Sequence, residues 1–169
     1  MTDVVIWRLH DGAALDVLAE PYRHLHEAQT AVAPQLAHMP ERTAEASWER
    51  RRAAYEQWLA APDAFVALAQ RDVEIIGFAV VTFAGAYHGW ESGSRVGELK
   101  DLAVAPDERG RGIGSTLLDA VEDELARLGV AEYRVNVIAP NEDAARLYQR
   151  RGMTRVTSVF LARVANRRD

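Results

Sequence analysis

The chain has 169 residues, of which 49% are hydrophobic and 27% charged, values typical of one globular domain with a buried core. It contains no cysteine, which excludes disulfides, thiolate metal ligands and a cysteine nucleophile, and its net charge of −5 argues against non-specific nucleic-acid binding. The first residues lack a signal-peptide pattern and no run approaches ~18 apolar residues, so we expect a cytoplasmic protein that does not enter a membrane.

The first sixty residues predict one strand followed by helices. The expected elements are a strand at 4–9, a helix from 11 to about 22, a loosely helical segment at 24–39 and a firmer helix at 43–60. Asp11 is a suitable N-cap for the first helix, and Pro21 should disturb its end. In the last helix, Trp48 and Tyr55 belong to an apolar stripe, whereas Arg51 is assigned to the charged opposite side.

The remaining residues predict an alternation of strands and helices. The expected strands cover 64–70, 74–83, about 96–104, 133–138 and, as one bent or two short strands, 153–164; the expected helices cover 115–128 and 142–151. Gly129 should end the first of these helices, and Asn141 should cap the start of the second. A single α/β domain, with one mixed sheet flanked by helices on both faces, accounts for this order.

The turn before the helix at 115–128 combines glycines with arginines, in the order Arg109-Gly110-Arg111-Gly112-Ile113-Gly114. The first N–H groups of a helix and its dipole favour an anion, and glycine lets the backbone approach a ligand closely. The run lacks the Lys-Ser/Thr of a nucleotide P-loop and the spacing of a dinucleotide-binding turn. The turn therefore predicts a phosphate or pyrophosphate site. The alternative is a tight turn that binds nothing.

Two further segments stand in register with this turn. Residues 99–106 form a strand pattern that ends in Val-Ala-Pro, and residues 141–152 read Asn-x-x-Ala-x-x-x-Tyr-x-x-x-Gly. Together with the turn, which matches an Arg/Gln-x-x-Gly-x-Gly/Ala fingerprint, they resemble the GCN5-related N-acetyltransferase (GNAT) family, although Met153 replaces the family's final aromatic residue. The resemblance is strong over 98–153 and consistent in element order before it.

This resemblance implies a GNAT-like domain over residues 1–169 that moves an acetyl group from acetyl-CoA directly to a primary amine in a ternary complex. Its acetyl-CoA-binding core would cover about 96–153, and the acceptor side would use helices and a loop at about 10–60 and 85–97. The alternative is a non-catalytic acyl-CoA-binding sensor or partner subunit on the same fold. No metal is implied, and the histidines show no metal-site spacing.

By the same resemblance, the strands at about 98–104 and 133–138 splay apart and hold the pantetheine arm of acetyl-CoA between them. The expected partners of this arm are the backbone of Leu102, Ala103 and Val104, with the Leu102 N–H polarising the thioester carbonyl. Asn141 would bond the pantetheine as well as cap its helix. The expected pyrophosphate site is Arg109, Gly110, Arg111, Gly112, Ile113, Gly114 and Ser115.

Three side chains are candidates for catalysis. The resemblance places the Tyr148 hydroxyl near the CoA sulfur, where it would protonate the departing thiolate; the alternative is a half-buried core tyrosine. Glu98 and Asp101 are candidates for the general base, and strict alternation puts them on opposite faces of their strand unless a bulge intervenes. A salt bridge with Arg95 or Arg134, a solvated edge, or proton transfer through water are the alternatives for both acids.

The acceptor is expected to contact the loop at 85–97, where Tyr87, Trp90 and Glu91 are the candidate residues. The resemblance leaves open whether this acceptor is a small molecule or a peptide. It also includes dimeric members, and the apolar segment at 156–164 could supply an edge strand to a homodimer.

Overall fold

The computed structural model describes residues 4–9, 12, 14–87, 89, 91 and 93–162. Within these residues, one mixed sheet holds its strands in the order β1-β2-β3-β4-β5. The strands are β1 (Val5–Leu9), β2 (Phe65–Arg71), β3 (Glu74–Gly85), β4 (Arg95–Val104) and β5 (Tyr133–Val135). β1 to β4 are antiparallel to their neighbours, whereas β5 runs parallel to β4. The predicted mixed sheet is confirmed.

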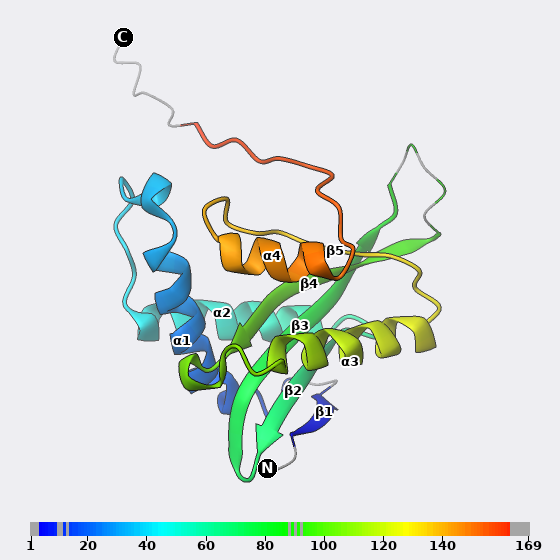
Figure 1. Ribbon diagram of the computed structural model, residues 1–169, viewed down its shortest axis with the longest axis horizontal. Helices are drawn as coiled ribbons and strands as arrows, with labels where there is room; N and C mark the ends of the chain where they lie inside the picture. Colours follow the sequence, from blue (N-terminus) through cyan, green and yellow to red (C-terminus); the bar gives the residue numbers. More distant parts are fainter. Residues whose placement is uncertain are drawn as a thin grey trace.

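Helices cover both faces of this sheet, as the sequence predicts (Figure 1). They are α1 (Ala19–Ala31), α2 (Ala44–Leu59), α3 (Ile113–Arg127) and α4 (Glu142–Arg150). Successive residues of β2 point to opposite faces, so Val66 packs in the core beneath α1 and α2, and Ala67 packs in the core beneath α3. Because both faces are buried, β2 is a continuous apolar run rather than an alternating one.

The prediction that Pro21 disturbs the end of the first helix is wrong. A short 3-10 helix, η1 (Leu15–Leu18), leads directly into α1, which continues well past Pro21. Proline is tolerated there because it is the third residue of α1, where a backbone N–H has no partner within the helix. The segment expected at 24–39 is the rest of α1 followed by η2 (Pro34–Leu36). Asp11, the predicted N-cap, lies outside the described residues.

The other helices begin and end within two residues of their predicted bounds. Thr43 caps α2, since its hydroxyl oxygen accepts a hydrogen bond from the Ala46 N–H at 3.2 Å. Asn141 caps α4 in the same way and accepts from the Ala144 N–H at 3.1 Å. Gly129 follows α3 with φ of 68°, the left-handed conformation in which glycine commonly ends a helix. Local sequence signals therefore set these boundaries.

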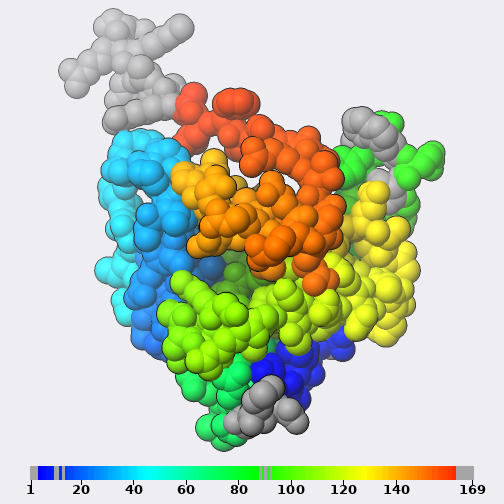
Figure 2. Space-filling view, viewed as in Figure 1, coloured from blue at the N-terminus to red at the C-terminus, as the bar shows by residue number. Residues whose placement is uncertain are grey.

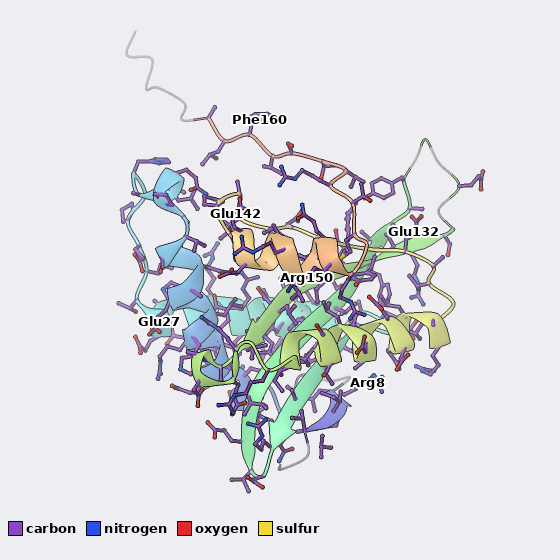
Figure 3. The ribbon with its side chains drawn as sticks, in the orientation of Figure 1. Arg8, Glu27, Glu132, Glu142, Arg150 and Phe160 are labelled. Carbon is purple, nitrogen blue, oxygen red and sulfur yellow. The ribbon has the colours of Figure 1, made fainter. Side chains whose placement is uncertain are left out.

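The last predicted strands are shortened or missing. β5 covers only the first half of the strand expected at 133–138, and the described part of the segment expected at 153–164 contains no strand. A strand needs a paired neighbour, and alternating apolar residues alone do not provide one. The segment lies on the outside of the molecule beyond α4, with the labelled Phe160 clear of the sheet (Figures 2 and 3). Its most exposed apolar side chains, 66% to 93% accessible, are Val156, Val159, Phe160 and Leu161.

Candidate active site

The edge of β4 that faces β5 is only partly paired. β5 pairs with Gly97, Glu98 and Leu99 of β4. β4 itself continues to Val104, and its other edge remains paired with β3 over this length. Among the described residues, the edge of β4 from 100 to 104 therefore has no strand beside it on the β5 side. Figure 1 shows α4 in front of this part of the sheet. The splayed strand pair implied by the resemblance is present.

The backbone groups of Leu102 and Val104 point into this gap. The N–H of Ala105 donates to the Ile76 carbonyl of β3 at 2.9 Å, so Ala105 is directed toward β3. Peptide groups of alternate residues in a strand point to opposite edges, so Val104 and Leu102 are directed away from β3, and Ala103 toward it. The N–H groups of Leu102 and Val104 and the Leu102 carbonyl therefore resemble the edge of a sheet that has lost one strand, whereas the Val104 carbonyl accepts from Nε of Arg109.

An extra residue in β4 decides which side chains lie together. Val80 of β3 lies opposite Asp101, and the next residue, Val81, lies opposite Leu99. Lys100 therefore has no partner of its own and forms a β-bulge. Val81 and Leu99 belong to the core beneath α3, whereas Val80 belongs to the core beneath α1 and α2. Asp101 consequently faces α1 and α2.

The bulge brings the two candidate bases to one face. Glu98 lies opposite Thr82, which neighbours Val81 on β3 and therefore points to the face of α1 and α2. Asp101 points to this same face. The expectation from strict alternation, which put Glu98 and Asp101 on opposite faces, is wrong because the inserted residue reverses the alternation between them.

Asp101 is a buried carboxylate with two partners from α2. Its side chain is 1% exposed. The Tyr55 hydroxyl donates to its Oδ2 at 2.7 Å, and Nη1 of Arg51 lies 3.6 Å from the same oxygen. Burial raises the pKa of Asp101, and the Arg51 charge and the Tyr55 hydrogen bond only partly oppose this rise. A carboxylate with a raised pKa is a stronger proton acceptor than an ordinary one.

Glu98 has a different environment. Its Oε2 accepts from the Lys100 ammonium at 2.6 Å, and its Oε1 accepts from Nε of Arg134 at 2.9 Å. Partial burial would raise the pKa of Glu98, but these two cations lower it below its usual value. Glu98 is thus the shared counterion of Lys100 and Arg134, which makes it the weaker base of the two.

Tyr148 lies near Asp101, on the other side of the splayed strands. It belongs to α4, two helical turns after Asn141, and is 8% exposed. Burial, followed by the negative charge of Asp101, raises the pKa of Tyr148 above its usual value. The phenol is therefore fully protonated at neutral pH and can donate a proton.

The glycine-rich turn follows a 3-10 helix, η3 (Pro106–Glu108), and opens α3 with its backbone exposed. Gly110 and Gly112 have φ of 75° and 85°, which side chains disfavour, and an added Cβ would meet no atom within 4 Å at either position. Gly114 has ordinary helical φ. The N–H groups of Ile113, Gly114 and Ser115 are the first of α3 and have no acceptor within the helix. The turn is a cradle of free amides at a positive helix end.

The two arginines of the turn have protein partners. Nε of Arg109 donates to the Val104 carbonyl at 3.2 Å, and Nη1 of Arg111 lies 3.4 Å from a carboxylate oxygen of Glu108. Glu108 is buried and also accepts from Arg71. Both arginines remain exposed. The backbone amides, rather than the arginines, are therefore the groups of the turn that await a partner.

The predicted acceptor residues are only partly described. Tyr87 is half-buried, and its ring lies under the Arg134 guanidinium, with 5.5 Å between guanidinium carbon and ring centroid. Glu91 is exposed, and Trp90 lies outside the described residues. Tyr87 is thus connected to Glu98 through Arg134, which places it beside the site.

The sequence prediction assigned the helix at 43–60 to the acceptor side but missed that Arg51 and Tyr55 of α2 contact Asp101. Arg51 was expected on the charged side of this helix, but it lies over Trp58 and contacts Asp101. Residues four apart share a helix face, so the spacing of Arg51 to Tyr55 could have indicated this position. Lys100 was also missed, because its place near the Trp58 ring depends on the bulge.

Among the described residues, no group of His, Asp and Glu side chains could hold a metal ion. No described helix is long and apolar enough to cross a membrane.

The sequence profile described as the Acetyltransferase (GNAT) family matches residues 17–153. A mycothiol acetyltransferase of Renibacterium salmoninarum is 30% identical over 123 residues, which cover 73% of this chain and 35% of that protein. The mycothiol acetyltransferase of Acidimicrobium ferrooxidans is 36% identical over 85 residues, or 50% of this chain and 26% of that protein. The matched segments cover only 22% to 38% of the length of the curated relatives that the chain matches.

A solved structure of a GCN5-related N-acetyltransferase from Ralstonia eutropha shares the fold, with a TM-score of 0.73, 19% identity, and coverage of 95% of this chain and 98% of that one. At identities this low, such a likeness shows the fold alone. The family profile, by contrast, matches the chain across the turn, β4 and α4. The protein belongs to the GNAT family of acetyltransferases.

Proposed function

We propose that the protein moves an acetyl group from acetyl-CoA to a primary amine, by direct attack of the amine within a ternary complex. The observation that carries this proposal is the open edge of β4. This edge lies between the two buried groups Asp101 and Tyr148 and the amide cradle at the start of α3. A sheet edge of this kind can accept an extended ligand as a missing strand.

The chain's own groups fit the three chemical parts of acetyl-CoA. The amides of residues 109–115 would hold the pyrophosphate, where Gly110 and Gly112 leave room for close approach. The backbone of Leu102 and Val104 would pair with the pantetheine amides, and Asn141 would add a side-chain bond. Ala103 would line this edge without bonding, since its peptide groups are directed toward β3.

Bound acetyl-CoA supplies a thioester, whose carbonyl carbon is attacked by the amine nitrogen and whose carbon–sulfur bond then breaks. The Leu102 N–H would stabilise the negative charge on the carbonyl oxygen during this attack. Asp101 would accept the proton that the amine loses, directly or through one water, because its raised pKa suits a base. Tyr148 would donate its proton to the departing sulfur. Glu98 would position Lys100 and Arg134.

An acceptor screen tests this function. The protein is mixed with acetyl-CoA and a panel of amines that includes amino acids, peptides, amino sugars and polyamines, and free CoA thiol is measured over the hydrolysis background. We expect at least one amine to release CoA and to appear as its N-acetyl product by mass spectrometry. If acetyl-CoA raises the melting temperature but no amine yields product, the sensor function on the same fold replaces this proposal.

The relatives do not supply the acceptor. The named acceptor of the mycothiol acetyltransferases belongs to proteins about twice as long as this chain, since the 123 matched residues are 35% and 38% of their lengths. One structure with the same fold is an aminoglycoside N-acetyltransferase in complex with CoA, at 22% identity and a TM-score of 0.67 over 97% of this chain and 96% of that one. We therefore propose an amine acceptor without naming it more closely. We also propose that residues 1–169 form one domain that acts in the cytoplasm. The exposed apolar side chains between 156 and 161 support a second copy of the chain as a partner.

A further inference from the structure

Within the described residues, three cations gather on the acceptor side of β4. They are Arg51 from α2, Lys100 from the bulge and Arg134 from β5. Each lies over an aromatic ring: the Arg51 guanidinium and the Lys100 ammonium are 5.7 Å and 5.2 Å from the Trp58 ring centroid. Among the described residues, the carboxylates paired with them are Glu98 and Asp101. The three cations thus outnumber the carboxylates that pair with them, in a chain whose net charge is −5.

Two of these cations share one carboxylate. Lys100 and Arg134 both pair with Glu98, with nitrogen–oxygen distances of 2.6 Å and 2.5 Å. These short hydrogen bonds hold the two cations in place. Arg51 differs from them, because its carboxylate partner, Asp101, lies beyond hydrogen-bond distance.

The Arg51 guanidinium contacts two aromatic rings and is only partly bonded. Its carbon lies 5.9 Å from the Tyr22 ring centroid and 5.7 Å from that of Trp58, and Tyr22 is also its hydrogen-bond partner. Its nearest distance to Asp101 is 3.6 Å, longer than a hydrogen bond. Its side chain is 29% exposed. A guanidinium has five N–H donors, so several remain for a ligand.

A purely structural arginine would be expected to bind Asp101 through two short hydrogen bonds, as arginine–carboxylate pairs commonly do. Arg51 instead lies 3.6 Å from the buried carboxylate and contacts the Tyr22 and Trp58 rings. This arrangement preorganises one planar, donor-rich edge beside the proposed amine site.

We propose that the acceptor amine carries an anionic group, a carboxylate or a phosphate, and that Arg51 binds this group. The inference rests on the proposed acetyl transfer, since it names the acceptor class of the same site. The three cations would also repel a polyamine or another polycation, and would favour the neutral form of the attacking amine. Arg51 is a specificity residue in this account and takes no part in proton transfer.

Matched acceptors test the inference. Alanine is compared with alaninamide, and glucosamine 6-phosphate with glucosamine, so that each pair differs in one anionic group; spermine serves as the polycation. We expect the anionic member of one pair to have a kcat/KM about tenfold higher, as expected for a charge-assisted hydrogen bond. A response of the first pair identifies a carboxylate ligand, and a response of the second a phosphate ligand.

Substitution of Arg51 then connects the preference to this residue. In Arg51→Gln the ratio within the responding pair should fall toward one, and in Arg51→Lys, which keeps the charge opposite Asp101, it should fall only in part. Arg52→Gln is the matched control: Arg52 is the next residue of α2, but it pairs with Asp16 and Glu56. Its ratio should equal that of the unmodified protein.

Two results would overturn the inference. One is a preference for the neutral members or for spermine, in which case acetyl transfer stands and only the acceptor class is wrong. The other is a ratio that Arg51→Gln and Arg51→Lys leave unchanged although both variants stay folded by thermal unfolding. If no amine of any charge releases CoA, the proposed function itself fails, and this outcome is distinct from the other two.

Discussion

The two halves of the candidate site, the acetyl-CoA side and the acceptor side, use different chemical groups of the chain. On the acetyl-CoA side, the groups that await a ligand belong to the backbone: the edge of β4 and the amides at the start of α3. On the acceptor side, the groups are side chains from separate elements, with Arg51 and Tyr55 from α2, Asp101 from β4 and Arg134 from β5. The first half can bind one common ligand. The second can change its specificity by substitution without altering the fold.

This difference also separates two kinds of sensitivity. A backbone site depends on φ, on helix caps and on strand pairing. It is therefore disturbed by substitutions whose side chains disfavour the backbone conformation that the site needs. A side-chain site depends on charge and on packing, so it is disturbed by conservative replacements of single groups. Variants in each half should therefore affect binding of acetyl-CoA and turnover separately.

The largest difference between the effect on turnover and the effect on acetyl-CoA affinity is expected for Tyr148→Phe. Loss of the proton donor should lower kcat by about a hundredfold, the usual contribution of acid–base catalysis, while the affinity for acetyl-CoA measured by calorimetry stays the same. Tyr133→Phe is the matched control, because the Tyr133 hydroxyl donates to Glu122 at 2.7 Å, on α3. An unchanged kcat in Tyr148→Phe would remove this residue from the reaction.

Gly112→Ala should affect the backbone half. Both Gly112 and Gly129 have positive φ and open surroundings, and they lie at opposite ends of α3. Alanine at either position should cost about 1–2 kcal/mol of stability. Only Gly112→Ala should also weaken binding of acetyl-CoA, by about tenfold, because its cradle must shift. Equal affinities in the two variants would contradict the assignment of the pyrophosphate site.

Tyr55→Phe should affect the acceptor half through pH. The Tyr55 hydroxyl stabilises the charged form of Asp101, so its removal should raise the pKa of Asp101 further. Since the base must be deprotonated, the acidic limb of the kcat/KM profile should move to higher pH by about one unit, the value of one hydrogen bond to a charge. Asp101→Asn should abolish this limb. A limb that moves to lower pH would exclude Asp101 as the base.

The smallest effect is expected at the two capping residues. Thr43→Ala and Asn141→Ala each remove one cap and should each lower stability by about 1 kcal/mol in thermal unfolding. Asn141→Ala should additionally weaken acetyl-CoA binding by about threefold, if its side chain bonds the pantetheine. Equal acetyl-CoA affinities in the two variants would show that Asn141 acts only as a helix cap and does not bond the pantetheine.

The backbone half was largely predictable from the sequence because its determinants are local. Glycines at 110 and 112, the cap at Asn141 and the end of α3 at Gly129 each act on the residues next to them. Pro21 was misread because its effect depends on where in a helix it falls: in the first turn it removes no hydrogen bond.

The acceptor half was not predictable in the same way. The contact of Arg51 with Asp101 joins residues fifty positions apart, and it requires both the packing of α2 on the sheet and the bulge at Lys100. The segment at 153–162 shows the opposite error, since its apolar pattern favours a strand but no strand of the described sheet pairs with it. Local sequence patterns do not indicate which distant residue a side chain or strand will contact.

The bulge at Lys100 also restricts how β4 can change in length. Gly97 donates its N–H to Glu132 before the bulge, while Leu102 and Val104 present their amides to the gap after it. If Lys100 stayed in the strand without a bulge, strict alternation from Gly97 would direct Asp101 and Ala103 to the gap in place of Leu102 and Val104. A further insertion between residues 99 and 102 without a bulge of its own should therefore be rare in related chains, whereas loss of Lys100 alone would keep Leu102 and Val104 facing the gap.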